Sequence, residues 1–180
     1  MMRRYAIRIP DLDVTPETVL PSSAPHPVFA RMIDDTKPDL IVEIGGCQGG
    51  STVYMASLCD AEIITVDPWT GPAGVRALEN FTRHIGSRKL GRRVIPLQMN
   101  SIAAATLAAK HDLQPRLVYV DGGHDEANVT IDIVNWLPLI PAGGIMFGHD
   151  HNMGGVSGAV KKCLGEGIER DGVFWIWRVK

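Results

Sequence analysis

The sequence predicts an α/β protein in which a mostly parallel, twisted sheet lies between two layers of helices, as a three-layer sandwich. Two observations lead to this prediction. Five short apolar runs are each followed by a segment of helical composition, which is the pattern of successive βα units. The runs are rich in aliphatic residues, as expected for parallel strands buried on both faces. Because right-handed crossovers bring the carboxyl ends of such strands to one edge of the sheet, we expect a ligand to bind there.

The elements follow one another in a regular order. Residues 1–25 are expected to form an irregular N-terminal arm with one short turn at 15–20, and residues 26–180 a single domain. Residues 26–36 are predicted to be a helix because their apolar side chains repeat at helical spacing and Pro38 stops it. The five strands are predicted at residues 40–44, 62–66, 93–99, 117–120 and 144–148. The helices that follow them are predicted at residues 51–59, 74–90, 101–110, 126–137 and 156–164. Residues 167–171 are expected to be a vestigial sixth strand, and residues 173–179 a shortened antiparallel strand that closes the chain.

The composition excludes several classes of protein. The chain has 180 residues, of which 45% are hydrophobic and 21% charged, and this suits one globular domain. A net charge of −2 gives no general attraction for nucleic acid, and no apolar stretch approaches the roughly 20 residues that span a bilayer. The basic residues between 83 and 93 are assigned to the solvated face and end of a helix. Three separate cysteines without CxxC spacing, and no signal-peptide pattern, predict a cytoplasmic protein. The net charge and the absence of a long apolar stretch predict that it has no nucleic-acid or membrane partners.

A glycine-rich turn, EIGGCQGG at residues 43–50, follows the first predicted strand. Its glycines allow a sharp bend and a close approach of the ligand, and the next helix directs its free N–H groups toward that ligand. The dinucleotide pattern G-x-G-x-x-G is not met, because Cys47 stands where the second glycine would let the backbone approach a pyrophosphate. The acidic-x-Gly-x-x-x-Gly spacing of Glu43, Gly45 and Gly49 resembles motif I of the class I methyltransferases. Their ligand, S-adenosylmethionine, has a cationic end that a carboxylate suits.

The resemblance implies a set of residues for the cofactor. In the turn and the helix after it, these are Glu43, Gly45, Gly46, Gly49 and Ser51. Asp67 ends the second strand, where a carboxylate can accept two hydrogen bonds from a ribose diol; its alternative role is a helix cap or a loop residue. Trp69 either flanks the adenine or packs in the core. Asn100 and Ser101 contact the adenine in the family pattern, and one of them is expected to be the N-cap of the next helix.

Acidic and imidazole side chains follow the fourth and fifth strands. Asp121 and His124 come after the fourth strand, and His149, Asp150 and His151 after the fifth. Because these strands are neighbours in this architecture, the side chains are expected to converge at one edge of the sheet. We expect the catalytic residues to be among them, namely Asp121, His124 and His149.

The second half of the chain resembles a branch of small, Rossmann-like methyltransferases that includes macrocin-type O-methyltransferases and cephalosporin hydroxylase-like proteins. Residues 119–124, 136–144 and 149–150 carry the resemblance, which extends over residues 38–180. In metal-dependent members an aspartate and an acidic pair bind magnesium, and they correspond to Asp121 and to His149 with Asp150. His149 departs from that pattern, because a histidine favours manganese, iron, zinc or nickel over magnesium. One hypothesis is therefore a divalent ion, magnesium or manganese, at Asp121, His149 and Asp150, with His124 and His151 as further candidate ligands.

The other hypothesis needs no metal. His124 or His149 then takes the proton of the acceptor hydroxyl, since an imidazole accepts a proton near neutral pH. Asp121 holds the cofactor's amine or orients the histidine. The histidines outside this edge are expected on the surface; they are His26, His84 and His111.

These observations predict an S-adenosylmethionine-dependent methyltransferase that O-methylates a small hydroxylated molecule, such as a sugar or natural product. The alternative is a metal enzyme or binding protein with the same fold and other chemistry. An NAD-dependent oxidoreductase is disfavoured by Cys47 and by the lack of a second nucleotide-binding half. No inserted domain is available to build an acceptor pocket, and on that ground we expect a homo-oligomer.

Overall fold

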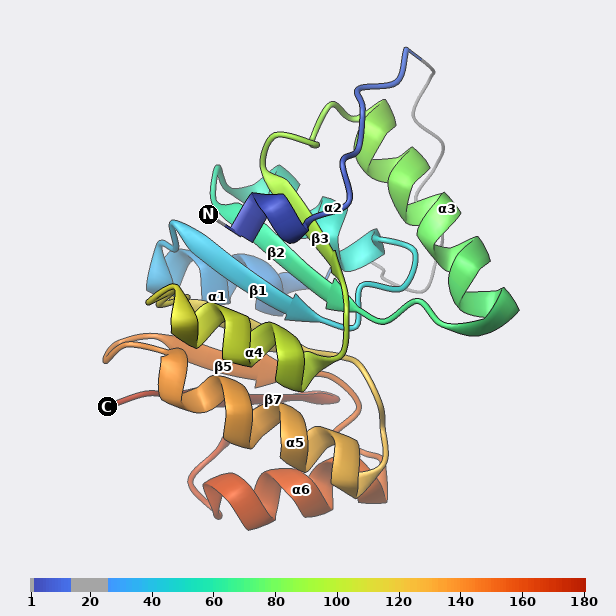
Figure 1. Cartoon of the computed structure of the whole chain (residues 1–180). Helices are drawn as coiled ribbons and strands as arrows, with labels where there is room; N and C mark the ends of the chain where they lie inside the picture. Colours follow the sequence, from blue (N-terminus) through green and yellow to red (C-terminus); the bar gives the residue numbers. More distant parts are fainter. Residues whose placement is uncertain (1, 14–25) are drawn as a thin grey trace.

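The computed structural model describes residues 2–13 and 26–180. A seven-stranded sheet crosses it in the order β3-β2-β1-β4-β5-β7-β6 (Figure 1). The strands are β1 (Leu40–Ile44), β2 (Glu62–Asp67), β3 (Val94–Gln98), β4 (Leu117–Val120), β5 (Ile145–Gly148), β6 (Glu169–Asp171) and β7 (Phe174–Arg178). Strands β1 to β5 are parallel, whereas β7 runs antiparallel to β5, and β6 antiparallel to β7. The predicted mostly parallel sheet with a short antiparallel C-terminal end is confirmed.

Helices cover both faces of the sheet, so the three layers are also confirmed. One apolar cluster joins the sheet to α1 (Pro27–Thr36), α2 (Gly50–Leu58) and α3 (Gly71–Ser87). The other joins it to α4 (Ser101–Lys110), α5 (Glu126–Trp136) and α6 (Gly154–Leu164), which lie together in Figure 1. Two short 3-10 helices, η1 (Met2–Tyr5) and η3 (Leu137–Leu139), complete the described elements. No helix among the described residues has the length and apolar character needed to cross a membrane.

The helix ends follow local chemistry. The side chain of Asn100 accepts a hydrogen bond from the Ala103 N–H at 2.8 Å, so Asn100 is the N-cap of α4. Helix α3 begins at Gly71, earlier than predicted, with a proline in its first turn where no backbone N–H is needed. The sixth strand is only three residues long, as expected of a vestigial strand.

The described part of the N-terminal arm packs on the edge of the sheet. The Ile7 N–H donates to the Pro96 carbonyl of β3, and the Leu12 N–H to the Gly86 carbonyl of α3, both at 3.0 Å. Met2 is buried in the cluster on the α4 side. The predicted turn at residues 15–20 lies outside the described residues.

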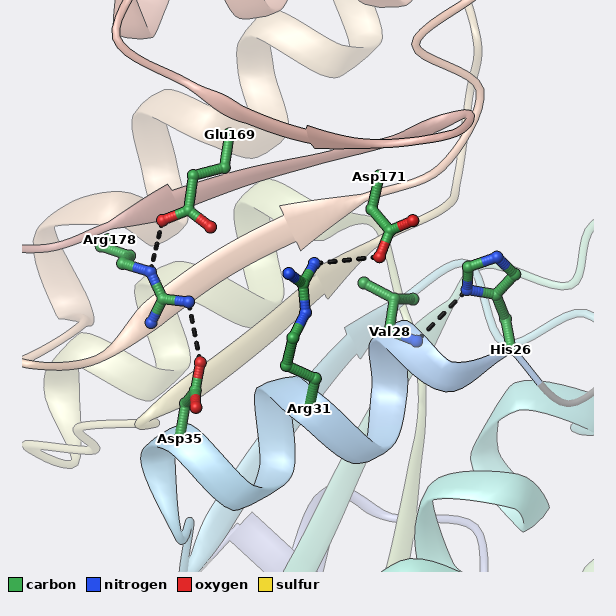
Figure 2. Close-up of polar contacts among 7 residues, drawn as sticks. All are labelled: His26, Val28, Arg31, Asp35, Glu169, Asp171 and Arg178. Atoms are coloured by element: carbon green, nitrogen blue, oxygen red, sulfur yellow. Dashed lines mark hydrogen bonds and ion pairs between the residues drawn. The ribbon is translucent and has the colours of Figure 1, made fainter.

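Ion pairs attach the β6–β7 hairpin to α1 (Figure 2). Arg178 lies 2.7 Å from Asp35 of α1 and 2.5 Å from Glu169 of β6, and Arg31 of α1 lies 3.0 Å from Asp171. At the start of α1, the His26 Nδ1 accepts a hydrogen bond from the Val28 N–H at 3.2 Å. His26 is half-buried and caps the helix, which corrects its assignment to the free surface. The last two strands therefore extend the sheet and are connected to α1 by these ion pairs.

Candidate active site

A cavity of about 790 Å³ opens at the carboxyl ends of the parallel strands. This volume lies within the usual range for small-molecule sites, roughly 300–1,000 Å³. The cavity is lined by most of the residues predicted from the sequence: Gly45, Gly46, Ser51, Asp67, Trp69, Asn100, Ser101, Asp121, His124, His149 and Asp150. Glu43 and Gly49 do not line it.

The glycine-rich turn between β1 and α2 lies against the end of β4. Gly45 has a φ of +93°, and a Cβ atom there would lie 2.1 Å from the Asp121 carbonyl oxygen. Its N–H donates to the Val66 carbonyl of β2 at 2.9 Å. Only glycine fits this position, because the backbone conformation and the contact both exclude a side chain. The turn is thereby fixed against both neighbouring strands.

Glu43 stabilises the turn through hydrogen bonds to the neighbouring elements. Its side chain is fully buried and accepts hydrogen bonds from the hydroxyl groups of Ser51, Thr52 and Thr65. Burial raises the pKa of this carboxyl to about 7, although the three hydroxyl groups oppose the shift. This geometry does not support the predicted direct contact with the cofactor, because Glu43 hydrogen-bonds on the α2 side of the sheet and does not line the cavity. It acts on the turn through α2 and β2.

Asp67 joins the turn to the loop after β2. Its Oδ2 accepts the Cys47 N–H at 2.9 Å, and its Oδ1 accepts the Trp69 N–H at 2.7 Å. Each oxygen keeps a lone pair that can accept a further hydrogen bond. The Trp69 indole N–H donates to the Cys47 carbonyl at 2.8 Å, and its ring packs edge-on against Phe81. Trp69 is therefore both a packing residue of the turn and part of the cavity wall.

His84 was expected on the surface, and this expectation is wrong. Its side chain is only 3% exposed, and Nδ1 lies 2.7 Å from the Gln48 carbonyl of the glycine-rich turn. The Asn80 amide donates to the Gln48 side chain at 3.0 Å. Helix α3 thus supports the turn from the outside. The sequence signal was the spacing of His84 from the buried Phe81 and Ile85 on the same face of α3.

An acid–imidazole cluster lies where β4 and β5 end. His124 Nε2 is 3.0 Å from Asp150 Oδ2 and 3.8 Å from Asp121 Oδ1. His149 Nδ1 is 3.0 Å from Asp150 Oδ1. The sequence-predicted convergence of these four side chains is thus present. Asp150 has a φ of +58°, so its loop holds a backbone conformation that non-glycine residues seldom adopt and that often occurs at functional sites.

Asp121, a partly buried acid of this cluster, is held by a tyrosine. The Tyr119 hydroxyl donates to its Oδ2 at 2.9 Å. Burial raises the pKa of Asp121, the Tyr119 hydrogen bond opposes that shift, and the charge of the nearby Asp150 adds to it. Burial also raises the pKa of Tyr119, which therefore remains a donor. Two carboxylates at one site attract a positive charge, either an imidazolium or a metal ion.

The ligand atoms best placed for a metal ion belong to Asp121, His124 and Asp150, which lie within 4.8 Å of one another. The set expected from the sequence had His149 in place of His124. His149 instead pairs with the other oxygen of Asp150 and lies edge-on to Phe174. His151 does not join the site.

His151 faces the C-terminal hairpin. Its N–H donates to the Val173 carbonyl at 2.8 Å, and its Nδ1 is buried without a hydrogen-bond partner among the described residues. Burial lowers the pKa of this imidazole, and the charge of Arg170 lowers it further. Its candidacy as a metal ligand is not supported.

Comparison with known proteins places these features in a family. A family model described as a methyltransferase domain matches residues 42–151, which include both the glycine-rich turn and the acid–imidazole cluster. A search of curated proteins finds no significant match.

Solved structures share the fold at low sequence identity. The TDP-rhamnose 3'-O-methyltransferase CalS11 of calicheamicin biosynthesis has a TM-score of 0.65 at 17% identity, over 84% of this chain and 76% of that one. An O-methyltransferase from Bacillus cereus, in complex with S-adenosylhomocysteine (SAH), has a TM-score of 0.70 at 15% identity, over 89% and 84%. The mycinamycin-pathway methyltransferase MycE, in complex with Mg, SAH and mycinamycin VI, has a TM-score of 0.59 at 17% identity, over 84% and 48%.

Proposed function

Because this chain belongs to the family of methyltransferase domains, we propose that it transfers a methyl group from S-adenosylmethionine to a hydroxyl oxygen of a small molecule, such as a sugar or natural product. The observation that carries this proposal is the arrangement of one continuous cavity. A glycine-rich turn and Asp67 line one part, and the acid–imidazole cluster lines another. The O-methyltransferases that share the fold support the choice of oxygen as the acceptor.

In this proposal the cofactor lies along the turn. Gly45 and Gly46 bring the backbone close to it, and the start of α2 presents free N–H groups. Asp67 accepts hydrogen bonds from the ribose diol through the lone pairs that Cys47 and Trp69 leave free. Both of its oxygens are already oriented by backbone N–H groups, so little side-chain freedom is lost on binding.

The reaction breaks the bond between sulfur and the methyl carbon and forms a bond between that carbon and the acceptor oxygen. The acceptor hydroxyl loses a proton, and the products are SAH and a methyl ether. His124, which lines the cavity, is the base in the metal-free form: its Nε2–H donates to Asp150 Oδ2 at 3.0 Å, which leaves Nδ1 to accept the proton. Both carboxylates stabilise the imidazolium that forms. The other contribution of the chain is to align the oxygen with the methyl group.

The donor set also fits a divalent ion. Two carboxylates and one imidazole offer mixed oxygen and nitrogen ligands within 4.8 Å, and a structural neighbour is described in complex with Mg. Asp121, His124 and Asp150 would hold the ion, which would supply positive charge that favours the ionised form of a hydroxyl. His149 is then the imidazole left to accept the proton, oriented by Asp150.

Ligand binding and proton transfer can be tested separately. Thermal unfolding with S-adenosylmethionine, SAH and NAD should show stabilisation by the first two compounds and not by NAD. The absence of any shift with both adenosyl compounds would refute the proposal. His124→Asn and His149→Asn should keep SAH affinity, and the variant that lacks the base should lose roughly 10²- to 10⁴-fold in turnover. Repeating both assays with EDTA decides between the two forms. If His124→Asn loses turnover and the turnover of the wild type does not change with EDTA, the metal-free form is correct.

A further inference from the structure

A second, much smaller cavity lies beside the acid–imidazole cluster, on the side of the sheet that α5 and α6 cover. Its volume is about 10 Å³, close to the space that one water molecule needs. Three valines form its apolar wall, namely Val120 of β4, Val129 of α5 and Val156 of α6. The loop of residues 121–124, which follows β4, forms the wall toward the active site, and His149 and Trp175 complete the lining.

The first turn of α6 packs directly on this loop. A Cβ atom on Gly155 would lie 2.4 Å from the carbonyl oxygen of His124. Helix α6 therefore approaches the loop as closely as a glycine allows, and the small cavity is enclosed between them and the sheet.

The indole ring of Trp175 extends across the sheet toward the same loop. Trp175 of β7 pairs with Gly148 of β5, which in turn pairs with Val120 at the end of β4. These three residues therefore form one row across the sheet. A Cβ atom on Gly148 would lie 2.6 Å from the indole Nε1, so the ring lies over this glycine, one strand away from its own backbone. The N–H group of Trp175 is thereby carried toward the carboxyl end of β4.

Polar groups on two sides of the small cavity have no partner within the protein. Trp175 is fully buried, and its indole N–H donates to no acceptor among the residues that the structure describes. On the loop side, the backbone carbonyls of Gly122 and Gly123 accept no hydrogen bond from residues 2–13 or 26–180. A buried N–H without an acceptor is unfavourable, whereas a buried water can bond to about three polar groups at once.

We propose that this cavity holds one water molecule, which accepts the hydrogen bond of the Trp175 indole N–H and donates to carbonyl oxygens of the loop after β4. The indole N–H can only donate, so its partner must offer a lone pair, and the cavity has room for one oxygen atom. Trp175 is thus a positioning residue for the loop that carries Asp121 and His124. The water site does not depend on the proposed function, but its value for the reaction rests on it.

A crystal structure of the full chain, at a resolution that shows ordered waters, tests the site directly. We expect a water oxygen at about 2.7–3.2 Å from Trp175 Nε1, with a second contact to the loop after β4. An empty cavity, or a direct hydrogen bond from the indole to a protein oxygen, would overturn the proposal.

The positioning role is tested by removing the N–H while the ring is kept. A synthetic peptide of residues 163–180, ligated to the rest of the chain at the native Cys163, can carry benzothienylalanine at position 175, in which sulfur replaces the N–H. In hydrogen exchange followed by mass spectrometry, the amides of residues 121–124 should exchange roughly three- to tenfold faster than in the ligated natural sequence. The amides of α4 should keep their rates.

The same replacement at Trp177 is the matched control, because this tryptophan lies on the same strand and does not line the small cavity. It should leave the exchange of residues 121–124 unchanged. Trp175→Phe, compared with Trp177→Phe, should show the same difference and serves as a second pair of variants if the ligated chain does not fold.

Unchanged exchange in the loop after replacement at Trp175 would mean that this side chain only packs, and equal acceleration by the change at Trp177 would mean the same. Either result overturns the positioning role. None of these measurements needs an adenosyl ligand, so their failure leaves the proposed function standing. Conversely, the absence of SAH binding would refute the proposed function without removing the water site.

Discussion

Replacing Glu43 with glutamine tests how the glycine-rich turn is supported. The buried carboxyl has a pKa of about 7 in the folded chain, against an ordinary value of 4.5. The folded state therefore binds the proton more tightly than the unfolded state does. The stabilising effect of the protonated Glu43 carboxyl on the folded state is complete below pH 4.5 and is lost as the pH rises through about 7. At roughly 1.4 kcal/mol per pKa unit, the wild type should lose about 3 kcal/mol of unfolding free energy from this group between pH 4.5 and 8.

Glutamine has no proton to lose, and its amide can replace the protonated carboxyl among the hydroxyl groups of Ser51, Thr52 and Thr65. In urea unfolding at several pH values from 5 to 8, the free energy of unfolding of Glu43→Gln should rise steadily relative to that of the wild type as the pH rises. Asp132 also carries a raised pKa, but it is present in both proteins and cancels in the difference. Glu79→Gln, an exposed acid on α3, should follow the wild-type curve. Parallel curves for Glu43→Gln and the wild type would refute the argument.

Three further changes test other contacts. Gly45→Ala should abolish SAH binding and lower the unfolding temperature, since a Cβ atom would lie 2.1 Å from the Asp121 carbonyl oxygen just after β4; wild-type binding would contradict that packing. Arg178→Ala should lower stability by less than about 1 kcal/mol in urea unfolding, because its ion pairs are partly exposed, and a loss of several kcal/mol would mean that the hairpin depends on them. Asp150→Asn should remove any thermal stabilisation by Mn²⁺ while SAH still stabilises the chain; an unchanged Mn²⁺ response would place the ion elsewhere.

The strands, and the neighbouring positions of the fourth and fifth, could be predicted from sequence because the signals are local and the topology rules are strong. Apolar runs, glycines and helix caps indicate each βα unit, and the crossover rule places Asp121 and Asp150 at one edge of the sheet. The directions in which individual side chains point could not be predicted. Strand β1 is buried on both faces, so its pattern could not show that Glu43 points toward α2 and away from the cavity. For His84, the helical spacing from Phe81 and Ile85 does indicate a buried face, but it does not show that the Gln48 carbonyl of the glycine-rich turn is the partner of the imidazole.

The choice between His124 and His149 could not be read from spacing either. It depends on the loop after β5, where Asp150 takes a left-handed backbone conformation and turns its two oxygens toward different imidazoles. Loop conformation of this kind follows from the packing of the whole edge. The sequence therefore identified the participants of the cluster, and the structure divided their roles.

The order of the strands explains why one cavity can serve an extended ligand and a reaction. Along the edge the order is β3, β2, β1, β4 and β5, and neighbouring strands are about 4.8 Å apart, so β3 and β4 are separated by about 14 Å. In the proposed arrangement, Asn100 and Ser101 face the base, Asp67 faces the ribose, the turn at Gly45 faces the amino-acid end, and Asp121 faces the transferred group. Base recognition and methyl transfer are then set by side chains that do not touch each other. Changes at Asp67 should therefore weaken SAH binding, whereas His124→Asn and His149→Asn should keep SAH affinity and change only the turnover.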